Sequence, residues 1–68
     1  MKITVEIYPY KWENPVLYFS TWDGFANYLG TMRPDYILRK TVRRSGYWFM
    51  VFRKDGVKEY ICATVTGQ

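Results

Sequence analysis

The stretch RKTVRRSGYWFMVFRKDG, residues 39–56, places basic side chains directly before an unbroken run of large apolar residues. The basic residues are Arg39, Lys40, Arg43 and Arg44, and the apolar run extends from residue 47 to residue 52. Ser45-Gly46, between the two, is typical of a tight turn in a β-hairpin. The stretch therefore predicts two antiparallel strands that carry both bulky aromatic and cationic side chains.

The other elements follow from alternation, helical spacing and turn residues. The expected strands cover residues 2–8, 16–20, 36–43, 47–53 and 57–65, and the expected helix covers residues 20–30. Ser20 or Thr21 can cap the first turn of the helix, and Gly30 suits a left-handed position at its end. This order predicts one α+β domain over residues 1–68, with one helix packed on a mainly antiparallel sheet of up to five strands.

Side chains alternate across a strand, so Leu38 and Val42 share one face, and Arg39 and Arg43 project from the other. Because the helix packs on apolar side chains, we expect Leu38 and Val42 in the core. Both arginines should then lie on the helix-distal face of the sheet. The other expected core residues are Ile3, Val5, Ile7, Leu17 or Tyr18, Trp22, Phe25, Leu29 and Ile61.

Two registers of the hairpin remain open. A three-residue Arg-Ser-Gly turn directs Trp48, Met50 and Phe52 towards the helix. A two-residue Ser-Gly turn directs Phe49 and Val51 there instead. In either register a row of large apolar side chains stays on the helix-distal face, because a helix of about ten residues, roughly 15 Å long, covers only one face.

The sequence offers little equipment for catalysis or metal binding. It contains no histidine, which is the usual general base near neutral pH, and Cys62 is its only cysteine. A single thiol excludes an intrachain disulfide and cannot form a four-ligand zinc site. We therefore expect no enzyme activity, no metal, no cofactor and no small-molecule substrate.

The bulk composition also limits the partners. No segment reaches the roughly 18–20 apolar residues of a membrane span, and the first residues alternate where a signal peptide would carry an apolar run. We expect a cytoplasmic protein without a membrane partner, which suits the free thiol. The net charge of +4 permits contact with phosphates or with an acidic protein and requires neither.

Three interpretations of the helix-distal face follow. In the first, the loop of residues 9–15, with Tyr10 and Trp12, folds over the face and leaves no functional surface. In the second, which we prefer, the face and the basic hairpin bind another protein. That partner is a second copy of the chain, or a larger protein that the module inhibits or modulates, as small phage proteins often do. In the third, sheet aromatics stack on the bases of DNA or RNA within a rim of Arg and Lys.

The same residues serve the second and third interpretations, because interface centres and base-stacking platforms both use aromatic and cationic side chains. The predicted binding residues are Arg39, Arg43, Arg44, Tyr47, Phe49, Arg53, Lys54, Lys58 and Tyr60.

Overall fold

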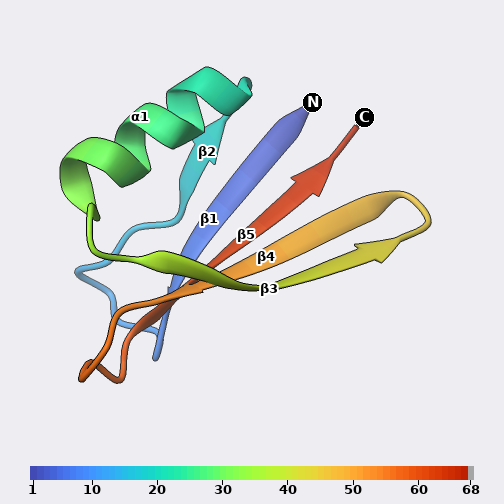
Figure 1. The fold of residues 1–68 in the computed structure, drawn as a ribbon. Helices are drawn as coiled ribbons and strands as arrows, with labels where there is room; N and C mark the ends of the chain where they lie inside the picture. The colour runs from blue at the N-terminus through green and yellow to red at the C-terminus, as the bar shows by residue number, and fades with distance from the viewer. Residues whose placement is uncertain (68) are drawn as a thin grey trace.

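The chain folds into a five-stranded antiparallel sheet with one α-helix on one face (Figure 1). The computed structural model describes residues 1–67. Its elements are β1 (Lys2–Tyr8), β2 (Leu17–Phe19), α1 (Trp22–Met32), β3 (Ile37–Arg44), β4 (Tyr47–Arg53) and β5 (Tyr60–Thr66). Across the sheet the strands lie in the order β2-β1-β5-β4-β3, and every neighbouring pair is antiparallel. The predicted α+β class and the predicted order of elements are confirmed.

The core lies between the helix and the middle of the sheet. Its buried side chains are Ile3, Val5, Ile7, Phe25, Met50, Phe52, Ile61, Ala63 and Val65. On β1 and β5 the buried residues alternate with partly buried ones, because successive side chains of a strand point to opposite faces. In residues 2–8 the apolar residues of the alternating sequence thus lie on the face that packs against the helix, and the residues between them lie on the other face.

The N-terminal end of α1 is fixed by Thr21. The Thr21 hydroxyl accepts a hydrogen bond from the Gly24 amide at 3.0 Å, as expected of an N-cap residue. One turn later, Phe25 is buried and meets Phe52 of β4 edge-on, with ring centroids 5.8 Å apart. The cap and the first apolar contact therefore lie within one turn of each other.

The C-terminal end of α1 lies beyond the expected stop. Gly30 is helical, not left-handed, and the helix continues to Met32. The Arg33 amide donates a hydrogen bond to the Leu29 carbonyl at 3.0 Å, and Pro34 follows. Proline lacks an amide hydrogen and disfavours a helical conformation of the residue before it. Pro34 therefore explains the end of the helix, and the predicted stop at Gly30 is wrong.

A β-bulge in β3 determines which side chains of the hairpin share a face. The ladder between β3 and β4 is regular from the turn to Lys40, which pairs with Val51, and its register then shifts so that Leu38 pairs with Phe52. Arg39, between them, has no partner of its own. One extra residue reverses the alternation along a strand. If alternate residues are counted from Leu38 across Arg39 without the bulge, every residue from Lys40 to Arg44 is therefore assigned to the wrong face of the sheet.

Two predictions for β3 are wrong for this reason. Arg43 pairs with Trp48 and projects to the helix side, whereas Val42 pairs with Phe49 on the helix-distal face. Neither predicted register is observed as stated. The turn has two residues, with a φ of +88° at Gly46, yet the buried residues of β4 are those of the three-residue alternative.

The structure also corrects the second strand connection and part of the core. The sequence Asp55-Gly56 also predicts a turn, and the structure has one there, with Gly56 at a φ of +77° and the Val57 amide donating to the Lys54 carbonyl at 3.3 Å. Residues 54–59 nevertheless join β4 to β5, so the predicted strand start at Val57 is wrong. Leu17, not Tyr18, packs against the core. The helix lies towards the β2 side of the sheet (Figure 1). As a result Trp22 and Leu38, both expected in the core, keep 37% and 46% of their surface exposed.

Candidate interaction surface

The helix-distal face of the hairpin combines apolar and cationic side chains. The strand register places eight residues of β3 and β4 there: Ile37, Lys40, Val42, Arg44, Tyr47, Phe49, Val51 and Arg53. Arg44 lies opposite Tyr47, and Lys40 lies opposite Val51. Because α1 packs on the other face (Figure 1), the helix does not cover these side chains.

Aromatic residues of the helix-distal face form two stacked pairs. The rings of Tyr47 and Phe49 are nearly parallel, at 11°, with centroids 6.4 Å apart. Tyr8 and Tyr60 stack at 24° with centroids 5.5 Å apart, and the Arg53 guanidinium lies 4.6 Å from the Tyr60 ring. One aromatic pair therefore lies on β4 near the β3–β4 turn, and the other lies on β1 and β5 at the opposite end of the helix-distal face.

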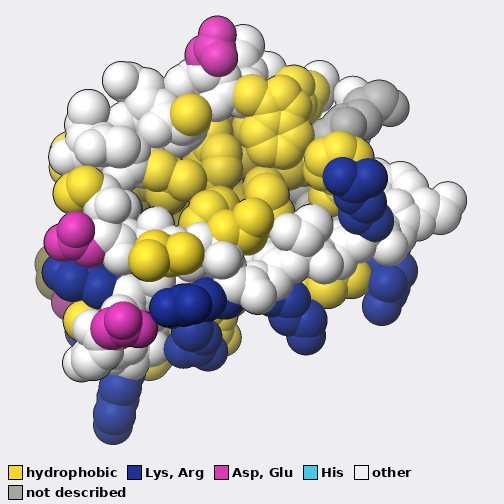
Figure 2. Space-filling model, viewed as in Figure 1, with side chains coloured by type: hydrophobic (Ala, Val, Ile, Leu, Met, Phe, Trp, Pro, Cys, Tyr) yellow, Lys and Arg dark blue, Asp and Glu magenta, His cyan; other side chains and the backbone are white. Residues whose placement is uncertain are grey.

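The helix side of the hairpin carries a second exposed apolar region. Trp22 of α1 and Trp48 of β4 approach each other with ring centroids 6.1 Å apart, and Leu38 is about half exposed. Arg43 lies over the Trp48 ring, 4.2 Å from its centroid. Figure 2 shows hydrophobic side chains gathered on this face between the helix and β3, with basic side chains along the margin. The helix therefore shelters only part of its own face of the sheet.

Cationic groups cover four aromatic ring faces. The pairs are Lys2 over Tyr18, Arg33 over Tyr36, Arg43 over Trp48 and Arg53 over Tyr60, at 4.2 to 5.7 Å from the ring centroid. These contacts use the negative face of the aromatic ring. A ring face under a cation is not free to stack on a nucleic-acid base. These rings are therefore less suited to base stacking than their number in the sequence suggests.

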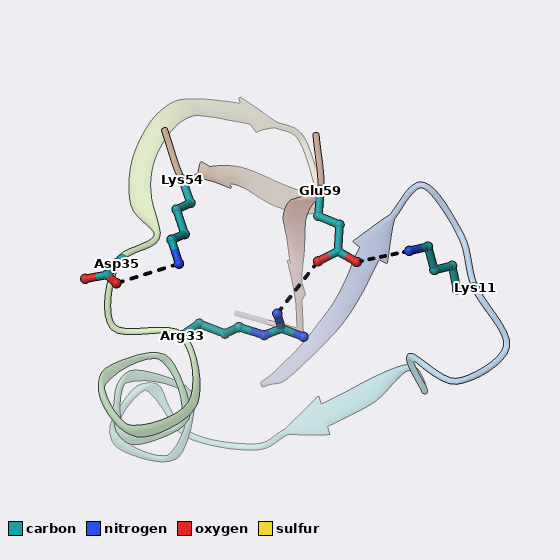
Figure 3. A network of polar contacts seen from close by, with 5 residues as sticks. All are labelled: Lys11, Arg33, Asp35, Lys54 and Glu59. Atoms are coloured by element: carbon teal, nitrogen blue, oxygen red, sulfur yellow. Dashed lines mark ion pairs between the residues drawn. The ribbon is translucent and has the colours of Figure 1, made fainter. Parts of the chain in front are cut away.

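Most ion pairs lie at the end of the sheet opposite the β3–β4 turn. The Glu59 carboxylate forms ion pairs with the Lys11 ammonium at 3.6 Å and with the Arg33 guanidinium at 4.0 Å. The Lys54 ammonium lies 3.8 Å from the Asp35 carboxylate (Figure 3). These contacts join the loop after β1, the end of α1 and the connection between β4 and β5. The charges at this end are largely balanced by one another.

The cations of the hairpin are not balanced in this way. Arg39, in the bulge, pairs with Asp55 at 3.3 Å. Within residues 1–67, no ion pair involves Lys2, Lys40, Arg43, Arg44, Arg53 or Lys58. Three of these six belong to β3 and a fourth ends β4. Like charges at short range repel, so a partner that brings negative charge to the hairpin would relieve this repulsion.

Strand β3 is also one of the two edge strands of the sheet, the other being β2. It spans eight residues, and all of its side chains except Val42 are exposed. An edge strand presents unpaired backbone amide and carbonyl groups that can pair with another chain. The edge therefore adds a hydrogen-bonding surface to the cationic and apolar ones.

The predicted binding residues do not form one cluster. Arg44, Tyr47, Phe49, Arg53 and Tyr60 share the helix-distal face. Arg43 lies on the opposite face, Arg39 and Lys54 are ion-paired, and Lys58 lies in the connection to β5.

Sequence reasoning missed four exposed residues of this surface or next to it: Trp22, Ile37, Leu38 and Lys40. Uninterrupted alternation places Lys40 on the helix side, between Leu38 and Val42, whereas the bulge at Arg39 directs it to the helix-distal face. A cationic residue among apolar core positions was the one available signal that the alternation was interrupted.

The loop of residues 9–15 does not cover the sheet as the first interpretation requires. Trp12 is 92% exposed, so it packs on no part of the sheet. Tyr10 is 64% exposed, and its ring lies 6.3 Å from that of Tyr8, at one end of the helix-distal face. The loop therefore leaves the outer face of β3 and β4 open.

Two side chains of the helix-distal face, Cys62 and Tyr8, have raised pKa values. Burial raises the pKa of the Cys62 thiol. Burial also raises the pKa of Tyr8, and a hydrogen bond with Glu6 together with the negative charge of that carboxylate adds to the effect. A thiol that stays protonated is a weak nucleophile. The arrangement gives Cys62 the properties of a packing residue.

Comparisons with known proteins give this chain no relative. No protein-family model matches it, and no match was found among curated proteins or among solved structures. Within the described residues, no helix combines the length and the apolar composition needed to cross a bilayer. Any function must therefore be argued from the surface itself.

Proposed function

We propose that this protein is a non-enzymatic module that binds another protein through the hairpin surface. The hairpin surface is defined as seven of the exposed side chains of β3 and β4, drawn from both faces of the hairpin: Ile37, Leu38, Lys40, Arg43, Arg44, Tyr47 and Arg53. Phe49 and Tyr60 extend its helix-distal part. The proposal includes a modulator of a larger protein and a cytoplasmic location, where Cys62 stays reduced.

One observation carries the proposal, namely the composition of β3 at the open edge of the sheet. Ile37 and Leu38 are 54% and 46% exposed, and Lys40, Arg43 and Arg44 follow without ion-pair partners among the described residues. Exposed apolar side chains next to arginine are characteristic of interface centres. A solvated edge strand also carries charged residues, so the exposed Ile37 and Leu38 beside them are what distinguish this edge.

A nucleic-acid partner is the second candidate, supported by the cations that lie on one face. Lys40, Arg44 and Arg53 all project from the helix-distal side of the hairpin. Against this candidate, Arg53 and Arg43 already lie over ring faces that would stack on bases. A protein partner uses the exposed apolar residues as well as the charges, and we therefore prefer it.

Affinity capture from the source cells tests the proposal. Arg44→Glu reverses one charge on the hairpin surface, and Lys58→Glu makes the same charge change at an exposed, unpaired residue outside it. We expect a stoichiometric protein partner that is retained by the native chain and by Lys58→Glu but lost by Arg44→Glu. Identical partners for all three proteins would contradict a binding role for the hairpin.

Two further measurements separate the other classes of partner. Binding of labelled oligonucleotides across a salt series should be weak and flat, whereas a nucleic-acid protein shows a steep negative log–log slope. Sedimentation velocity at increasing concentration should give a constant mass. A mass that doubles with concentration would identify the partner as a second copy of the chain.

A further inference from the structure

We infer that the partner segment is an acidic extended strand that adds to the open edge of β3, an inference that rests on the proposed function. The strand would continue the antiparallel sheet beyond β3 and place its carboxylates against Lys40, Arg43 and Arg44. Strand addition of this kind takes its affinity from backbone hydrogen bonds and its specificity from alternate side chains.

The shape of the edge sets the length of the added strand. Pairing between β3 and β4 is regular from Lys40 to Arg44, and the bulge at Arg39 interrupts it. A bulge bends and twists a strand locally, which hinders pairing along that part of the edge. Five residues of regular edge therefore remain for a partner strand. The helix lies towards β2, at the other side of the sheet, and does not obstruct this edge (Figure 1).

The charges of the edge exclude a second copy as the added strand. An antiparallel pair of β3 strands centred on Val42, the middle of the regular edge, would set Lys40 of each chain opposite Arg44 of the other. Like charges directly opposite each other destabilise a strand pair. The same residues that keep identical chains apart attract a strand of opposite charge, since opposite-charge pairs across strands are stabilising.

The register of the hairpin predicts the order of side chains in the partner. Arg44, Val42 and Lys40 project on the helix-distal side, and Arg43 and Thr41 project on the helix side. In an antiparallel partner, residues opposite these five would read acidic, acidic, apolar, hydroxyl and acidic along the chain. The apolar side chain would lie beside Val42 and extend the row that contains Phe49. The Cβ atoms of directly opposed residues lie about 4.5–5.5 Å apart, which suits ion pairs on both faces.

A synthetic peptide of twelve residues with the central sequence Glu-Glu-Val-Thr-Glu provides the probe. We expect it to bind the native protein and to protect alternate amide hydrogens of β3 from exchange. A second peptide replaces Val-Thr by Pro-Pro and keeps every charge. Successive backbone amides of a strand point in opposite directions, so one of the two prolines must remove a donor that faces β3. We expect this change to weaken binding at least about tenfold, a loss of the size expected when a backbone hydrogen bond is left unmade.

Charge-reversed proteins locate the site. Arg44→Glu should weaken binding of the acidic peptide about tenfold or more, and Lys58→Glu should weaken it by less than about threefold, because distant surface charges are screened. Circular dichroism of both variants checks that the fold is retained.

Several outcomes would overturn the inference. Equal binding of the acidic and Pro-Pro peptides would show attraction by charge without strand pairing. An oligonucleotide that displaces the peptide and binds more tightly would assign the edge to nucleic acid. Absence of peptide binding together with a captured partner that depends on Arg44 would reject the added strand and leave the proposed function intact. If capture fails as well, both proposals fall.

Discussion

The guanidinium carbon of Arg43 lies 4.2 Å from the ring centroid of Trp48, on the helix side of the sheet. Trp22 approaches the same indole from α1, with ring centroids 6.1 Å apart. Arg43 thus packs against an aromatic pair at the margin of the core, and its charge remains available at the edge strand. One side chain therefore contributes both to stability and to the proposed interaction surface.

Replacing Arg43 by alanine should lower the free energy of unfolding by about 0.5–1 kcal/mol, the usual size of an exposed cation–π contact. The matched control is Arg44→Ala, one residue further on and on the other face. Its guanidinium lies over no described ring, so we expect a change within about 0.5 kcal/mol. Urea denaturation followed by tryptophan fluorescence measures both. Equal losses in the two variants would show that the Trp48 contact adds nothing to stability.

The elements of the fold could be predicted from the sequence because their signals are local. The alternation of residues 2–8 specifies a half-buried strand, and the Thr21 cap together with the apolar spacing from Trp22 specifies the helix. Ser45-Gly46 likewise identifies the turn. Each of these patterns needs only a few neighbouring residues to be recognised.

The faces of β3 could not be predicted in the same way. Leu38, Arg39 and Lys40 read as an ordinary alternating strand, and the only local irregularity is Lys40, a cation between the apolar positions Leu38 and Val42. The bulge allows two arrangements at once. Leu38 pairs with Phe52, and the turn keeps two residues while Trp48 faces the helix. Such arrangements come from the assembled sheet and have no local pattern.

Deleting Arg39 should be tolerated. The deletion joins Leu38 directly to Lys40. Leu38 can still pair with Phe52, and Lys40 can still pair with Val51, so the ladder becomes regular and the side chains keep their faces. We expect a loss of less than about 1 kcal/mol, because the ion pair with the almost fully exposed Asp55 contributes little.

Deleting Val51 of β4 makes the contrasting comparison. That deletion leaves the bulge in place and makes Met50 and Phe52 adjacent, so one of these two buried side chains must leave the face that packs against the helix. It should cost several-fold more, and chemical denaturation compares the two. Similar losses would mean that the bulge does not set the alternation.

The glycines at positions 30 and 46 should respond to alanine in opposite directions. Gly30 lies within the helix with open space around its Cβ position, so Gly30→Ala should stabilise the protein by about 0.5–1 kcal/mol. Gly46 has a φ of +88° in the turn, where a Cβ atom costs about 1–2 kcal/mol. Thermal denaturation of the two variants tests both signs. Stabilisation by Gly46→Ala would contradict the two-residue turn.

Cys62 should react slowly with thiol reagents. Burial raises its pKa above the ordinary value of 9.0, so the folded protein holds less thiolate than the unfolded chain at the same pH. The folded state therefore prefers the protonated thiol, and this contribution to stability is complete below pH 9 and is lost as the pH rises through the folded pKa. Labelling rates of native and denatured protein between pH 7 and 10 measure the difference. Faster labelling of the native protein would identify an activated thiol instead.

The paired carboxylate of Glu59 should contribute more to stability than that of Asp55. Glu59 accepts two cations, Lys11 and Arg33, and its side chain keeps 27% of its surface exposed, whereas Asp55 has one partner and keeps 95% exposed. Exposed ion pairs contribute about 0–1 kcal/mol, and Glu59→Gln should fall near the upper limit while Asp55→Asn falls near zero.

High salt separates the electrostatic part from any change in packing. At 1 M ionic strength the screening length falls to about 3 Å, so the loss caused by Glu59→Gln should shrink markedly. The denaturation midpoint of each variant, measured at low and high salt, is the test. A loss that is unchanged by salt would show that Glu59 acts through the packing of its side chain between the loop after β1 and the end of α1, and not through its charge.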